Sequence, residues 1–77
     1  MKATSYKVIH NGYKIDFLDS MEQVDELIET RLAPYNHLRP QKIMDRTLKT
    51  SGNKKMRLVR YAYHTLYEED FIIDYEC

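Results

Sequence analysis

Apolar and polar residues alternate in two short segments near the N-terminus, residues 4–10 and 13–18, which flank Asn11-Gly12. Such alternation predicts strands that bury one face. Asn-Gly favours a tight type I′ turn, because both central positions of that turn need a positive φ. We therefore predict a β-hairpin here. The side chains predicted to share its apolar face are Tyr6, Val8, Tyr13, Ile15 and Phe17.

The spacing of apolar residues changes to a helical period over residues 20–33. The apolar stripe consists of Met21, Val24, Leu27, Ile28 and Leu32. Ser20 with Gln23, or Asp19 with Glu22, can form a capping box at the N-terminus of this helix. Pro34 then disfavours helical backbone at the residue before it. The pattern predicts one amphipathic helix that packs on the hairpin.

Residues 41–49 fit two patterns, and residues 35–41 before them read as a loop. As a strand, this segment would place charged and apolar side chains on the same face. As a helix, it would gather its apolar residues on one face, and most of its residues are good helix formers. Pro40 and Gly52 also suit the two ends of a helix. We predict a short second helix, with a strand as the alternative.

The last third of the chain predicts a second hairpin. Residues 50–54 read as a turn, 56–67 and 71–76 as strands, and 68–70 as the turn between those strands. The fold class that follows is α+β, with a small antiparallel sheet in a single domain over residues 1–77. The predicted order of elements is β-β-α-α-β-β, and the alternative is β-β-α-β-β-β.

A chain of 77 residues can bury only a thin hydrophobic core. It contains no apolar run near the roughly 18 residues of a membrane span, and its N-terminus lacks the apolar region of a secretory signal. The single cysteine, Cys77, cannot form an internal disulfide. These features lead us to expect a cytoplasmic protein with no membrane partner. The seven tyrosines are the residue type that suits contact surfaces.

Charge is sorted by position along the chain. Residues 35–64 carry eight bases and one acid, a net charge of +7, whereas residues 65–77 carry a net charge of −5. Residues 1–34 carry −2, so the whole chain sums to zero. The basic residues of the central block are Arg39, Lys42, Arg46, Lys49, Lys54, Lys55, Arg57 and Arg60. Such a separation of charge can select a charged partner.

Neutralisation between neighbouring strands is the simplest explanation of this sorting. If the last two predicted strands form a hairpin around Glu68-Glu69, the acidic strand ends about level with Arg60 or Tyr61. The cations that would then extend past the last acid are Lys54, Lys55 and Arg57. The residues predicted to bind a partner are Lys42, Arg46, Lys49, Lys54, Lys55, Arg57, Tyr61 and Tyr63. The competing interpretation is an ordinary solvated face.

Residues that could carry catalysis are scattered. His10, His37 and His64 do not have metal-ligand spacing, and the terminal Cys77 has no base near it in sequence. The acidic run over 68–70 is typical of a solvated turn and only weakly suggests a metal site. Phosphate-binding and dinucleotide-binding glycine motifs are absent from the sequence. We therefore expect no enzyme activity, no cofactor and no metal.

Two functions remain compatible with the sequence. One is a small regulatory, adaptor or inhibitory module that binds a larger protein through its charged, tyrosine-rich surface. The other is a nucleic-acid-binding module that uses the basic segment 39–60 and the strand tyrosines. A net charge of zero and an acidic end favour the protein partner. The pattern identifies neither that partner nor an oligomeric state.

Overall fold

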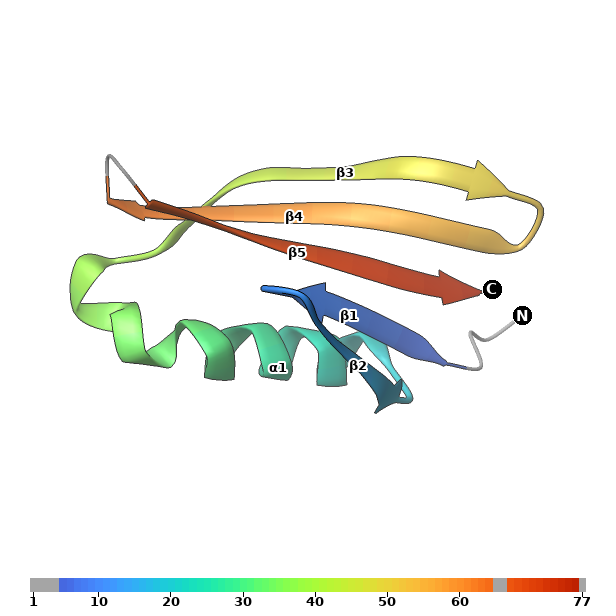
Figure 1. Cartoon of the computed structure of the whole chain (residues 1–77), viewed down its shortest axis with the longest axis horizontal. Coiled ribbons are helices and arrows are strands. Elements are labelled where there is room, and N and C mark those ends of the chain that lie inside the picture. The colour runs from blue at the N-terminus through green and yellow to red at the C-terminus, as the bar shows by residue number, and fades with distance from the viewer. Residues whose placement is uncertain (1–4, 65–66, 77) are drawn as a thin grey trace.

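The computed structural model describes residues 5–64 and 67–76, and in it one helix packs on a five-stranded antiparallel sheet (Figure 1). The sheet order is β2-β1-β5-β4-β3. In chain order the elements are β1 Tyr6–His10, β2 Tyr13–Leu18, α1 Met21–Leu32, the 3₁₀ helix η1 Ala33–Leu38, β3 Gln41–Ser51, β4 Lys54–His64 and β5 Tyr67–Glu76. The α+β class is confirmed, and the order of strands and α-helix is the alternative one, β-β-α-β-β-β.

The first hairpin forms where the alternation predicts it. Asn11 and Gly12 have φ values of 53° and 80°, and His10 pairs with Tyr13 across the turn. The predicted inner face is wrong in part, because the register of the two strands shifts between Tyr6 and Val8. As a result Leu18, and not Phe17, is buried at the end of β2.

The amphipathic helix is also confirmed. Its N-cap is Ser20, whose Oγ accepts a hydrogen bond from the backbone N–H of Gln23 at 3.3 Å. The side chain of Gln23 in turn accepts a hydrogen bond from the backbone N–H of Asp19. After Leu32 the chain continues as η1, where a loop was predicted, and that turn ends at Arg39 with a left-handed φ of 55°.

The predicted second helix over 41–49 is wrong, because these residues belong to β3. This strand pairs with β4 along its whole length, from Gln41 opposite Ala62 to Ser51 opposite Lys54. The pairing shifts register at Ile43 and at Leu48, and each shift breaks the strict alternation expected of a strand. Tertiary pairing with β4 therefore outweighs the local helix propensity.

The turn predicted over 68–70 is wrong as well, because these acids lie within β5. His64 pairs with Tyr67, which moves the hairpin connection to residues 65–66, outside the described part of the chain. The acidic strand therefore reaches farther than predicted: Lys54 lies opposite Glu76 and Lys55 opposite Tyr75.

The hydrophobic core lies on one side of the sheet, here called the helix side. Its buried members are Val8, Leu18, Val24, Ile28, Leu32, Val59, Phe71 and Ile73. Figure 1 shows α1 running alongside the β1–β2 hairpin, while β3 forms the opposite edge of the sheet. None of the β3 residues is buried. The other side of the sheet, here called the open side, carries no helix in the described chain. No described helix has the length and apolar character needed to cross a membrane.

Candidate functional site

Two exposed aromatic side chains, Phe17 and Tyr35, line a shallow groove on the helix side. The groove lies between the β1–β2 hairpin and the second half of α1 with η1. We call it the aromatic groove, and its principal lining residues are His10, Phe17, Leu27, Arg31, Tyr35 and Glu69. The groove exists only when the hairpin, α1 and η1 are packed together, so it is a product of the tertiary structure.

Phe17 stands at the rim of the aromatic groove with 77% of its surface exposed. The register shift in the first hairpin causes this exposure, because it turns Leu18 into the core in place of Phe17. Tyr35 lines the groove from η1 and is also exposed. Large apolar side chains left in water give up the stabilisation that burial would provide, about 1.5–3 kcal/mol for a residue such as phenylalanine.

A partly buried polar network forms the floor of the groove. His10 donates a hydrogen bond from Nε2 to Glu69 Oε2 at 2.6 Å, and the hydroxyl of Tyr63 donates to Glu69 Oε1 at 2.8 Å. The imidazole of His10 stacks on Phe71, with ring centroids 4.3 Å apart. His10 is only 7% exposed, and its Nδ1 has no hydrogen-bond partner among the described residues.

Tyrosine rings extend this network to the end of the sheet. Tyr63 stacks on Tyr35 of η1 at a centroid distance of 4.8 Å and on Tyr67 of β5 at 6.2 Å. Burial, followed by the hydrogen bond to Glu69, raises the pKa of Tyr63 to about 12. The hydroxyl therefore stays protonated at physiological pH and remains a donor to Glu69. These contacts fix η1 against β4.

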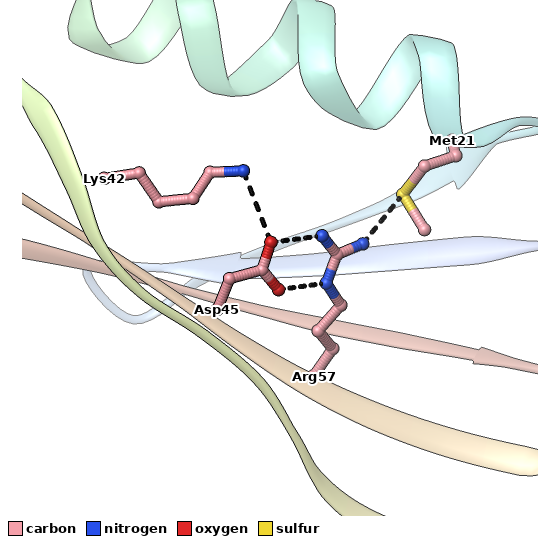
Figure 2. Close-up of polar contacts among 4 residues, drawn as sticks. All are labelled: Met21, Lys42, Asp45 and Arg57. Carbon is pink, nitrogen blue, oxygen red and sulfur yellow. Dashed lines mark hydrogen bonds and ion pairs between the residues drawn. The ribbon is translucent and has the colours of Figure 1, made fainter.

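Arg57 makes several contacts within the fold (Figure 2). Its guanidinium donates two hydrogen bonds of 2.6 Å to the carboxylate of Asp45 on β3, and a third contact of 3.6 Å reaches the sulfur of Met21 in α1. Lys42 adds an ion pair of 3.3 Å to the same carboxylate. The hydrogen bond from Arg57 lowers the pKa of Asp45 to about 2. Arg57 and Lys42 are thus already paired with Asp45.

The residues predicted to bind a partner do not form one surface. Residues that pair across antiparallel strands share a side of the sheet, so the register assigns each of them to a side. The residues on the helix side are Lys42, Lys55, Arg57, Tyr61 and Tyr63. The residues on the open side are Arg46, Lys49 and Lys54. Tyr61 also packs edge-to-face against Phe71 in the core, so only part of its ring is accessible.

The open side mixes acids with these bases. Arg60 lies opposite Asp70 and binds its carboxylate at 2.7 and 3.0 Å. This pairing lowers the pKa of Asp70 and raises the pKa of Arg60. Asp74 lies opposite Met56 on the same side, between Lys7 of β1 and the cations of β3. Bases and acids that are separate blocks in the sequence are therefore neighbours on this surface.

The acidic run over 68–70 does not converge on a single point. Glu69 faces the helix side, whereas Glu68 and Asp70 face the open side with Arg60. Within residues 5–64 and 67–76, no three potential ligands from histidine, cysteine, aspartate and glutamate come together. Cys77 and the side chain of His64 lie outside the described residues, and His37 is exposed on η1.

Sequence reasoning missed the groove residues His10, Phe17, Tyr35 and Glu69. His10 and Glu69 are 59 positions apart in the chain, and no local pattern indicates that they touch. The only local signal was the aromatic content of residues 13–17, which was assigned to the core. No family model, curated protein or solved structure matches the chain.

Proposed function

We propose that this protein is a small, non-enzymatic module that binds a larger protein partner through the aromatic groove. The observation that carries the proposal is the exposure of two aromatic side chains that line that groove, Phe17 from β2 and Tyr35 from η1. Aromatic side chains are enriched in protein interfaces, where a few of them provide most of the binding energy. A regulatory, adaptor or inhibitory role suits a module of this size.

Polar groups in the groove would add specificity to an aromatic contact. Arg31 lies at one wall, and the floor is formed by His10 and Glu69. A partner side chain that fills the groove would be held by apolar contact and oriented by these few polar atoms, as in typical binding pockets. The stacked tyrosines behind the floor keep η1 in place, so the groove needs little ordering on binding.

The burial of His10 supports a binding role over a catalytic one. A histidine next to a carboxylate resembles the base of a catalytic triad, and that base needs its second nitrogen free to reach a substrate. Here Nε2 is committed to Glu69, and Nδ1 is buried. His10 and Glu69 therefore suit a structural role at the floor of the groove.

Nucleic-acid binding is the less favoured candidate. On the open side, Lys54 and Arg60 of β4 lie opposite Glu76 and Asp70 of β5, and Asp74 lies opposite Met56. Phosphate groups would meet those carboxylates together with the lysines, which reduces the electrostatic attraction on which such binding depends. Tyr61 and Tyr63 lie on the helix side, away from Arg46 and Lys49, and so cannot stack bases over the same surface.

Site-specific photocrosslinking in cells that express the protein tests this proposal. A benzophenone amino acid replaces Phe17 in one variant and Lys14 in the control, which is exposed on the same strand but faces the open side. We expect position 17 to capture a defined protein that position 14 does not. Equal capture at both positions, or none at position 17, would contradict the groove as the interface.

A further inference from the structure

We propose that β3 is a docking edge for an acidic, extended segment of a partner protein, which adds to the sheet as a further strand. This surface is separate from the aromatic groove, because β3 and β2 are the opposite edges of the sheet. The inference therefore does not depend on what occupies the groove.

The geometry of β3 leaves its outer edge open. It is an eleven-residue strand that pairs, among the described strands, with β4 alone, and every residue of it except Met44 is exposed. On an edge strand, the N–H and C=O groups of alternate residues point away from the sheet and can bind another chain. The ladder is regular over residues 44–47, between the shifts at Ile43 and Leu48. Pairing of an added strand would be centred on these four residues.

Apolar side chains flank this central stretch. Ile43 is 53% exposed and Leu48 is 41% exposed, and each is the residue left unpaired by a register shift. An added strand could cover both side chains and gain apolar burial in addition to main-chain hydrogen bonds. Strand addition in known peptide-binding domains combines these two contributions in the same way.

Charge decides which kind of segment fits. The strand carries a net charge of +2, and its single acid, Asp45, is already bound by Arg57 and Lys42. Arg46 and Lys49 make no ion pair with any described residue. Lys54 and Lys55 follow the turn on β4, where Lys54 lies opposite Glu76 and Lys55 opposite Tyr75, so they are not part of this edge. An acidic segment would find two available cations, Arg46 and Lys49, on the edge strand itself.

The same charges disfavour a second copy of β3 as the occupant. Two copies would bring net charges of +2 together along one ladder, and like charges on neighbouring strands are destabilising. Lysines and register shifts are common devices that prevent edge strands from pairing indiscriminately. On β3, these features would disfavour pairing with a second copy of β3 and still allow pairing with a strand of opposite charge.

Peptide titration followed by amide chemical shifts tests the proposal on the intact chain. The probe is a short peptide of alternating glutamate and valine. The first control has the same sequence with N-methyl groups along one edge, which keeps the charge and removes the ladder hydrogen bonds. The second control replaces glutamate with lysine. We expect only the unmodified acidic peptide to shift residues 41–51 and to slow amide exchange over residues 44–47.

Two charge reversals make the result specific. Arg46→Glu and, independently, Lys49→Glu should weaken binding of the acidic peptide by about tenfold or more, because each replaces an attraction with a repulsion. Lys14→Glu makes the same change of charge on β2, the opposite edge of the sheet, and should weaken binding of the acidic peptide by less than about twofold. The proposal is overturned if the acidic peptide does not bind, if the N-methylated peptide binds equally, or if the shifts map to the aromatic groove.

Discussion

Glu69 joins parts of the chain that are far apart in sequence. Its two carboxylate oxygens accept hydrogen bonds from His10 on β1 and from Tyr63 on β4. The side chains of His10 and Glu69 are only 8% and 13% exposed, and Tyr63 stacks on Tyr35 of η1. A buried donor that loses its acceptor keeps the cost of desolvation without the compensating bond. The stability of the groove floor therefore depends on this single carboxylate.

Replacing Glu69 tests this role. Glu69→Ala should lower the free energy of unfolding by about 2 kcal/mol, because two donors lose their acceptor. Glu69→Gln keeps one carbonyl oxygen and should fall between that variant and the wild type. Glu68→Ala, which alters the neighbouring exposed acid, should have a much smaller effect. Urea unfolding at neutral pH measures all three, and equal losses for Glu68→Ala and Glu69→Ala would contradict the assignment.

Strand β3 is held to the rest of the fold by β4 and by the contact between Asp45 and Arg57. The guanidinium of Arg57 reaches both the carboxylate on β3 and the sulfur of Met21 at the start of the helix. Arg57 was predicted to be a free cation beyond the acidic strand, and this prediction is wrong. The residue connects the edge of the sheet to α1.

The pKa of Asp45 gives this contact a pH dependence. Its folded pKa of about 2 lies below the ordinary value of 3.8, so the contact stabilises the fold fully above pH 3.8 and is lost as the pH falls through 2. Because the pair is partly exposed, we expect it to contribute about 1 kcal/mol to the free energy of unfolding. Asp45→Asn should lower the free energy of unfolding by that amount at neutral pH. On acidification, its free energy of unfolding should then fall less than that of the wild type. Asp16→Asn, at an exposed position on β2, is the control, and its urea midpoint at neutral pH should stay close to that of the wild type.

Local signals account for the elements that sequence predicted correctly. Asn11-Gly12 determines the first turn, and Ser20 with Gln23 determines the start of α1, both through contacts within a few residues. The error over 41–49 arose because β3 is stabilised by pairing with β4, a contact that local propensity does not report. The exposure of Phe17 likewise depends on a register shift between two strands. The groove combines several such long-range contacts, so it could not be located in advance.

Antiparallel pairing brings the basic and acidic blocks of the sequence next to each other in the folded molecule. The basic block and the acidic block occupy neighbouring strands, β4 and β5, and Arg60 binds Asp70 directly. The separation of charge along the sequence is therefore largely cancelled in space over the open side. What remains basic is the β3 edge and the turn after it, which is a narrow surface for a polyanion.

Binding of a short single-stranded oligonucleotide tests this consequence. We expect no saturable binding up to about 100 µM at physiological salt, because the acids of β5 share the open side with the bases. Fluorescence anisotropy at several salt concentrations provides the measurement. Tight binding that falls steeply with salt, and that Lys49→Ala and Lys54→Ala weaken while Lys14→Ala does not, would favour the nucleic-acid function instead.

The most direct test of the proposed function is the dissociation constant of the partner captured from position 17. The purified complex is measured with the wild type, with Phe17→Ser, and with Lys14→Ser as the matched control on the same strand. We predict that Phe17→Ser weakens binding by roughly tenfold or more, equivalent to about 1.4 kcal/mol, while its fold remains intact. Lys14→Ser should change the constant by less than about twofold. Equal constants for Phe17→Ser and the wild type would contradict the groove as the binding surface.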